Sequence, residues 1–310
     1  MSGFFISWLA AVPELAIPYA LAALGLILCE RAGVLNLTVE GMMLVGAMAA
    51  IGCSIDLSSS PVVVLPVAMA AAAFVSLLFA LLVVVLRVDQ VVVGLAMVFL
   101  CAGGTDLIGT LAGWQNQPVT GLRPLDLFGL ASVPVLGPVL LNQSIVVYLT
   151  PVLVLLVHRF LGHSMTGLRL RAAGDAPDAV DAAGHSVVWL RVGGIVAGSA
   201  LMGLAGAAIS AAGVKMWFPN MTGGRGWIAI ALMLFARRQP WRALAGATLF
   251  GGIEALIPRI GGLGIRLPEY ILLTTPYVAT LVVMAWSGRR GEPAREPLAL
   301  GRPFLREERS

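Results

Sequence analysis

Side chains able to do acid–base, nucleophilic or metal chemistry are few in this chain and stand far apart. The three histidines form no HExxH pattern and pair with no cysteine at metal-ligand spacing. The three cysteines lie in apolar stretches without a CxxC pair. No glycine-rich loop ending in Lys-Ser or Lys-Thr occurs, and Lys215 is the single lysine. We therefore expect no catalytic residue, no metal site and no bound cofactor, so that energy for any work comes from an ion gradient or a partner.

The composition of the chain indicates whether water or lipid surrounds it. The chain has 310 residues, of which 59% are hydrophobic and 12% charged, whereas soluble domains carry about 25% charged residues. Its mean hydropathy is +0.93. We therefore expect lipid to face most of the surface, which excludes a large soluble helical protein. The net charge of +4 comes from basic residues at span ends and in the tail, so we expect no nucleic-acid partner.

Long apolar stretches predict the fold class. About 20 apolar residues suffice for a helix to cross a bilayer, and these stretches are apolar all round, unlike the alternating strands of a membrane barrel. The sequence predicts an all-α polytopic membrane protein with about 8–10 transmembrane helices. The segment 226–237 is too short to cross alone. The candidate spans are 9–29, 39–57, 62–86, 90–112, 143–161, 191–212, 226–237, 241–258 and 269–287.

The basic residues predict the orientation of these spans. Nine alternating spans place 15 of the 20 Lys and Arg residues on the side that holds segment 163–190 and the tail 288–310. Because basic residues gather on the cytoplasmic side, we expect the N-terminus outside and both of these segments in the cytosol. Residues 1–287 then form one transmembrane domain, with a structured outer loop over 113–142. The polar tail is expected to be disordered.

The segment 163–190 is a polar island between apolar spans. Its sequence predicts two short helical pieces, the first ending at Gly174 and the second ending at Gly184. Asp175 is expected to cap the second piece, with Pro177 in its first turn. Such a rigid element facing the cytosol favours a docking role, and the alternative is a merely solvated loop.

Two further polar segments break the apolar pattern. Segment 30–43 contains Asn36 and Glu40 between two spans, and ionisable groups near the membrane interior are functional candidates. The alternative is an interfacial turn in which a glutamate pairs with Arg31. Segment 215–227 combines Asn220, Thr222 and Arg225 with three glycines, a composition that permits irregular backbone beside a watery path. Its aromatic residues are expected to be interfacial anchors or, alternatively, to stack on a planar ligand.

At these three segments the chain resembles permease subunits of ABC importers for nucleosides and simple sugars, a group akin to the ribose and branched-chain amino-acid permeases. The similarity covers roughly residues 15–287 and rests on 30–43, on 167–174 continuing to 182–184, and on 218–227 followed by 242–251. The resemblance implies a type II ABC importer-like permease fold. It implies ATPase-coupling roles for Gly167, Arg169, Arg171, Gly174, Asp175, Pro177, Ala182, Ala183 and Gly184. The candidates for the translocation path are Asn36, Glu40, Asn220, Thr222 and Arg225.

The resemblance also implies partners and a location. Two cytosolic ATPase subunits would bind ATP-Mg and dock on segment 163–190. A second permease subunit, expected to be a different chain, would share a central path, and an extracytoplasmic substrate-binding protein would deliver a purine nucleoside or a related simple sugar. The chain would be a multi-pass protein of a bacterial inner (plasma) membrane, in contact with lipid, and not itself an enzyme.

Three other classes remain open from the residues alone. An ion-coupled secondary transporter of a small polar solute would need ionisable groups within spans, for which Asp106 and Glu254 are the candidates. An intramembrane enzyme would need a nucleophile–base pair or a metal set inside the spans, and none is visible. A channel would conduct without a binding protein.

Overall fold

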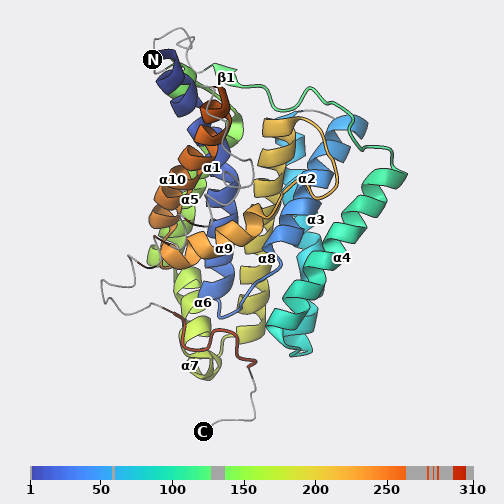
Figure 1. Ribbon diagram of the computed structural model, residues 1–310. Coiled ribbons are helices and arrows are strands. Elements are labelled where there is room, and N and C mark those ends of the chain that lie inside the picture. The colour runs from blue at the N-terminus through green and yellow to red at the C-terminus, as the bar shows by residue number, and fades with distance from the viewer. Residues whose placement is uncertain are drawn as a thin grey trace.

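The computed structural model describes residues 2–57, 60–126, 137–262 and 296–304, together with the single positions 278, 282 and 285. Helices dominate the described residues (Figure 1). The first four are α1 (Ser2–Arg31), α2 (Val39–Asp56), α3 (Pro61–Ala80) and α4 (Gln90–Leu111), and the π-helical turn η1 (Leu81–Val85) extends α3. Next come β1 (Leu125–Asp126), the π-helical turn η3 (Gly137–Leu141) and β2 (Asn142–Gln143). The second half contains α5 (Ile145–His163), α6 (Met165–Asp175), α7 (Pro177–Ala182), α8 (Val187–Ala207), the π-helical turn η4 (Ala208–Val214), α9 (Arg225–Phe235) and α10 (Pro240–Gly262).

Six of the described helices are long and apolar enough to cross a membrane. They coincide with the first six predicted spans, so the prediction of an all-α polytopic membrane protein is confirmed. The predicted segments 226–237 and 241–258 are α9, which has only 11 residues, and α10. The predicted span 269–287 lies outside the described residues, apart from three isolated helical positions.

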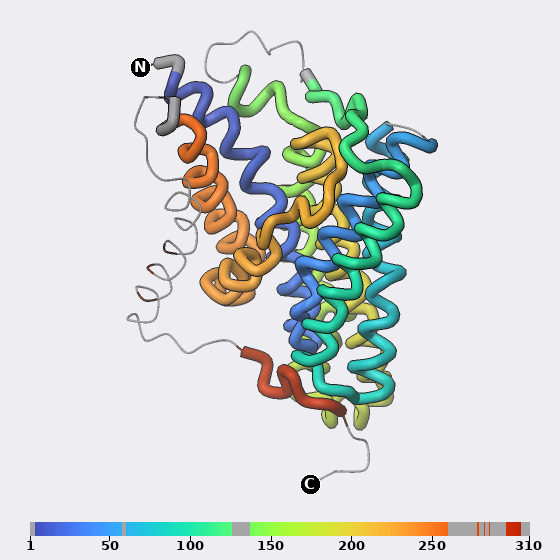
Figure 2. The backbone as a smooth tube through the Cα atoms, turned by 45° about the vertical axis from the view of Figure 1, so that its right-hand side comes forward, coloured from blue at the N-terminus to red at the C-terminus, as the bar shows by residue number. Residues whose placement is uncertain are grey.

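Helix α1 lies at the centre of the bundle. It packs along α10 on one side and α8 on the other, while α2 and α3 pack on the opposite flank of α8 (Figures 1 and 2). The chain starts at one end of the bundle, and α6, α7 and residues 296–304 lie at the opposite end (Figure 1). The two-residue strands β1 and β2 pair antiparallel and form the one sheet among the described residues.

Small residues let α8 approach its neighbours. A Cβ added at Gly198 would meet the backbone of Gly25 on α1, and one added at Gly203 or Gly206 would meet the backbone of α3 or α2. Such close contacts replace the hydrophobic force that is missing between helices in lipid. The α8 glycines therefore allow tight helix packing.

The start of the outer loop is structured, as predicted, and it is tied to η4 and to the segment that follows η4. Backbone hydrogen bonds run from Asn116 to the Trp217 carbonyl (2.8 Å), from Val119 to Lys215 (2.9 Å) and from Leu122 to Ala211 (2.9 Å). Residues 127–136 of this loop are outside the described part.

The expectation that Trp217 is an interfacial anchor is wrong. Its side chain is fully buried and lies against Gly109 of α4, where a Cβ would overlap the indole ring. The reason is tertiary, because the glycine opens a space in α4 that only an inserted ring fills.

Candidate functional site

The turn between α1 and α2 is organised by Asn36. Its side-chain oxygen accepts hydrogen bonds from the backbone N–H of Thr38 (2.9 Å) and from the Thr38 hydroxyl (2.7 Å). Its amide nitrogen lies 3.3 Å from the sulfur of Cys29. Gly33, with φ of +85°, provides the left-handed backbone that starts the turn. The backbone N–H of Leu35 donates to the side chain of Gln90 at the start of α4 (2.7 Å), so the turn is held from both sides.

Glu40 joins this turn to the start of α9. One carboxylate oxygen accepts hydrogen bonds from the Thr222 hydroxyl (2.5 Å) and the Gly224 N–H (2.8 Å), and the other accepts from the Gly226 N–H (2.6 Å). The carboxylate therefore accepts hydrogen bonds from backbone N–H groups at the positive end of α9, although Glu40 is distant from α9 in the sequence. A Cβ at Gly226 would meet the Glu40 backbone, which explains the glycine at this position.

Arg225 begins a second polar cluster on α9. Its guanidinium donates to Glu254 of α10 (2.5 Å), and the Tyr19 hydroxyl of α1 donates to the other oxygen of that carboxylate (2.8 Å). The side chains of Arg225 and Glu254 are 27% and 18% exposed. This cluster joins three helices and keeps one edge open. The sequence did not single out Tyr19, because one tyrosine in an apolar span carries no pattern.

The five predicted path residues fall into two groups. Asn36, Glu40 and Thr222 are at most 4% exposed and are hydrogen-bonded inside the protein. Arg225 is partly exposed, and Asn220 is exposed with a left-handed backbone (φ of +54°). The buried group thus fixes the backbone, and only the second group presents side chains at the surface of the chain.

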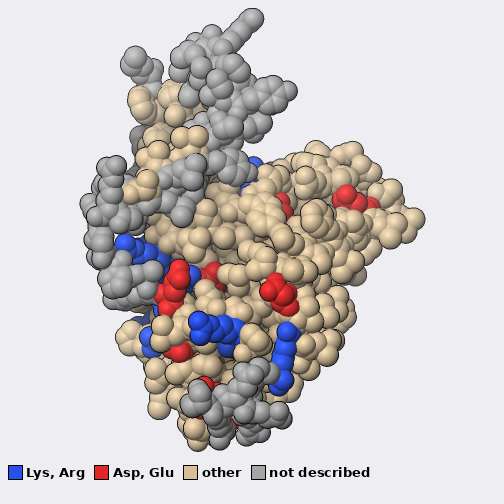
Figure 3. Space-filling model, turned by 60° about the horizontal axis from the view of Figure 1, so that its bottom comes forward, with Lys and Arg blue, Asp and Glu red and all other residues tan. Residues whose placement is uncertain are grey.

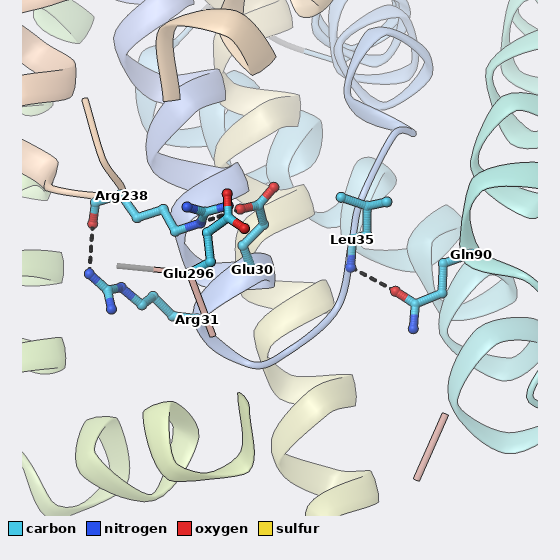
Figure 4. Close-up of polar contacts among 6 residues, drawn as sticks. All are labelled: Glu30, Arg31, Leu35, Gln90, Arg238 and Glu296. Atoms are coloured by element: carbon cyan, nitrogen blue, oxygen red, sulfur yellow. Dashed lines mark hydrogen bonds and ion pairs between the residues drawn. The ribbon is translucent and has the colours of Figure 1, made fainter. Parts of the chain in front are cut away.

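A buried ion pair holds the other end of α9. Arg238, in the turn between α9 and α10, donates to Glu30 at the end of α1 (2.5 Å), and these side chains are 4% and 3% exposed (Figure 4). Arg31 donates to the Arg238 carbonyl (3.4 Å), and Glu296 lies 3.5 Å from the Arg238 guanidinium. The hydrogen-bond partners of the two glutamates are thus distant in the sequence: Arg238 for Glu30 and the start of α9 for Glu40.

The polar island contains two helices, as predicted, but their junction is displaced. The Ser164 hydroxyl caps α6 by accepting from the Gly167 N–H (2.9 Å). Helix α6 runs through Gly174 to Asp175, and the residue before α7 is Ala176, which makes no side-chain cap. The expected end at Gly174 and the expected cap by Asp175 are both wrong. The break falls at Ala176 because the residue before Pro177 is forced out of the helical region.

The end of α7 is as predicted. Gly184 has φ of +80°. Its N–H donates to the backbone carbonyl of Asp181 (2.9 Å), and the N–H of His185 donates to the backbone carbonyl of Val180 (3.1 Å). This pair of hydrogen bonds is the Schellman arrangement, which stops a helix sharply.

Two glycines seat the island on the rest of the protein. A Cβ at Gly167 would overlap the Phe160 carbonyl, and one at Gly174 would meet the Arg31 carbonyl at 2.6 Å and the Gly33 nitrogen at 2.9 Å. The remaining predicted coupling residues lie toward solvent: Arg169, Asp175, Ala182, Ala183 and Gly184 are exposed, while Arg171 and Pro177 are half-buried. Charged side chains of both signs gather at this end of the molecule (Figure 3).

Within the described ranges, no group of three or more His, Cys, Asp or Glu side chains is placed to hold a metal ion. The geometry instead links elements. The α6–α7 unit touches the α1–α2 turn through Gly174, and that turn holds both ends of α9 through Glu40 and Glu30. These contacts connect the α6–α7 unit with both ends of α9.

Comparison with known proteins identifies the class of the chain. It is 33% identical to the putative glucose ABC transporter permease protein of Haloferax volcanii, over 98% of this chain and 99% of that protein. It is 32% identical to the guanosine ABC transporter permease protein of Bacillus subtilis, with 95% of each chain covered. It is 29% identical to the nucleoside ABC transporter permease protein of Lactococcus lactis, over 86% and 88% of the two chains. No solved structure gives a significant match.

The family model described as "Branched-chain amino acid transport system / permease component" matches residues 9–284. With six apolar helices of spanning length, the chain is a multi-pass protein of the inner membrane. Members of this family are the permease subunits of ABC systems, which work with ATPase and binding-protein partners. The predicted resemblance is confirmed, and this chain belongs to the branched-chain amino acid transport system permease family of ABC transporters.

Proposed function

We propose that this ABC permease imports purine nucleosides or a related simple sugar. The names of the relatives, which specify glucose, guanosine and nucleosides, support this substrate class. The observation that carries the mechanism is the continuous path of contacts from α6 to α9. Gly174 lies against Gly33, the turn continues to Glu40, and Glu40 holds the first turn of α9.

In this proposal two cytosolic ATPase subunits dock on the α6–α7 unit. They bind ATP-Mg, and this chain binds no cofactor of its own. A second permease subunit, of different sequence, completes the path, and an extracytoplasmic binding protein delivers the substrate. The predicted coupling residues that are exposed, Arg169, Asp175, Ala182, Ala183 and Gly184, are available for this contact.

The partly exposed side chains on α9 and its neighbours would line the path. Arg225 supplies hydrogen-bond donors, Glu254 supplies acceptors, and Asn220 offers both. Sugar hydroxyls and the edges of purine bases are uncharged groups that hydrogen-bond with such side chains. Glu40, Asn36 and Thr222 would act indirectly, by fixing the position of α9.

Reconstitution tests the proposal. The permease pair and its ATPase subunits are placed in proteoliposomes, and uptake of labelled guanosine, adenosine or glucose is measured with binding protein outside and ATP inside. Uptake that requires ATP and the binding protein is expected, and an ATPase partner unable to hydrolyse ATP serves as the control. Uptake driven by a proton or sodium gradient without ATP would favour the secondary-transporter alternative.

A further inference from the structure

Residues 296–304, which we call the strap, cross the end of the molecule formed by α6 and α7 (Figures 1 and 2). The backbone N–H of Ala299 donates to the carbonyl of Gly174 (2.9 Å), and the N–H of Gly301 donates to the carbonyl of Gly33 (3.2 Å). The strap therefore bridges the backbones of α6 and of the α1–α2 turn, which touch at Gly174 and Gly33. The disorder predicted for the tail 288–310 does not describe these residues, which follow a defined path.

Arg191 anchors the strap from α8. Its side chain is 3% exposed, and one terminal nitrogen donates to the carbonyl of Arg302 (2.9 Å). Among the described residues, its other two guanidinium nitrogens make no hydrogen bond. A buried guanidinium is costly unless it is hydrogen-bonded. The strap carbonyl thus supplies the one acceptor that the described residues offer to this cation.

Apolar packing and one ion pair fasten the two ends of the strap. Phe304 packs against a small buried cluster of Ala173, Val180 and Val187, contributed by α6, α7 and α8. Glu296 lies 3.5 Å from Arg238, but its side chain is 58% exposed. Exposed ion pairs contribute little. The backbone bonds, Arg191 and Phe304 therefore carry most of the attachment.

We infer that the strap is a positioning element that makes α7, the α1–α2 turn and α8 move as one body when the ATPase subunits act on α7. Helix α7 has only six residues, and α6 and α7 are separated by the non-helical Ala176. A unit broken at that point can bend at the junction. The strap spans the junction, from Gly174 on α6 to Val180 on α7. This inference rests on the proposed function, and Arg191 is the positioning residue that it assigns.

A reversible cross-link distinguishes a strap from an autoinhibitory latch that must release. Val180→Cys and Phe304→Cys are combined, and the reconstituted importer is treated with a short, reducible bis-thiosulfonate reagent. The three native cysteines are buried, and each single-cysteine variant is the control. A strap predicts that the cross-linked complex keeps its ATP-dependent uptake. Uptake that is blocked by the cross-link and restored by reductant would overturn the inference.

Truncation after residue 295 measures the contribution of the strap. The truncated permease is expected to copurify with its ATPase subunits and to hydrolyse ATP, while the number of ATP molecules used per imported substrate rises at least about fivefold, the lower end of typical couplings between sites. An unchanged ratio, or loss of ATPase binding, would contradict a positioning role.

Arg191 provides the matched test. Arg191→Leu should raise the ATP-to-substrate ratio as truncation does, and Arg191→Lys, which keeps one donor for the Arg302 carbonyl, should retain most of the coupling. Because Arg191 acts through the strap, Arg191→Leu should add nothing in the truncated chain, and additive effects would argue against the assignment. Wild-type uptake in the same vesicles tests the proposed function by itself. Formation of the cross-link between residues 180 and 304 tests the contact of the strap with α7, and it can be measured even if no uptake occurs.

Discussion

The two ends of α9 are held in different ways by one short region of the chain. At its start, Glu40 accepts from backbone N–H groups and a hydroxyl, so the contact is a helix cap supplied from a distance. At its end, Glu30 forms a buried ion pair with Arg238. The cap depends on three donors, two of them backbone N–H groups, whereas the ion pair depends on one charged side chain. The comparison predicts a larger loss of stability when the acceptor at the start of α9 is removed than when the ion pair at its end is broken.

The largest effect is expected from removing the cap. Glu40→Ala leaves three donors without their acceptor in a buried site, at roughly 1–3 kcal/mol each. We expect loss of uptake and a destabilisation of roughly 3–9 kcal/mol, measured by thermal unfolding of the purified permease. Glu40→Gln is the control, since its carbonyl retains one acceptor and should give an intermediate value. A wild-type unfolding midpoint for Glu40→Ala would show that the cap contributes nothing.

Breaking the ion pair from one side should come next. Arg238→Met leaves Glu30 buried without its partner, and such a loss costs roughly 3–5 kcal/mol. The double variant Glu30→Leu with Arg238→Met removes both charges and should be more stable than either single variant. A double-mutant cycle by thermal unfolding measures this coupling. Additive destabilisation would mean that the two charges do not interact.

The contact between α6 and the α1–α2 turn should be sensitive to one added methyl group. Gly174→Ala brings a Cβ to within 2.6 Å of the Arg31 carbonyl, and overpacking of this kind costs roughly 1–3 kcal/mol. We expect weaker uptake and lower thermal stability. Gly162→Ala is the matched control, because nothing lies within 4 Å of a Cβ at Gly162. Equal effects of the two changes would contradict the close approach.

The Arg225–Glu254 pair should affect function more than stability. Both side chains are partly exposed. Glu254→Gln keeps a carbonyl acceptor, so it should change the free energy of unfolding by less than about 1 kcal/mol. If this cluster lines the path, uptake should fall with little change in ATPase activity. Uptake assays at several substrate concentrations provide the check, and normal uptake would remove Glu254 from the path.

The smallest effect is expected at Glu296. Its contact with Arg238 is long and exposed, so Glu296→Ala should alter stability by at most about 1 kcal/mol. A larger loss of stability, measured by thermal unfolding, would show that the attachment of the strap begins at Glu296 and not at Ala299.

The spans and the sharp end of α7 were predictable from sequence because their causes are local. Apolar runs of spanning length define the helices, and Gly184 ends α7 through its own backbone conformation. The junction at Ala176 was missed although its cause is also local. The prediction rested on Gly174 and Asp175, whereas Pro177 determines where the helix breaks.

The partners of the charged residues could not be predicted. Glu30 and Arg238 are 208 positions apart, and Glu40 and Gly226 are 186 positions apart. No periodicity links such residues, and in a single sequence a glutamate followed by an arginine suggests the neighbouring pair. The same holds for Trp217, whose burial depends on Gly109 in another helix.

The lipid environment, the spanning helices and the family could be inferred from the linear chain, because apolar length, charge distribution and three ordered motifs are properties of the sequence. The roles of the polar residues in those motifs follow from the folded structure. Most of them cap, pair and close-pack across the bundle, since a buried polar group must find its partner wherever the fold brings one within reach. The path of residues 296–304 was decided in the same way, because the buried Arg191 of α8 donates a hydrogen bond to the Arg302 carbonyl.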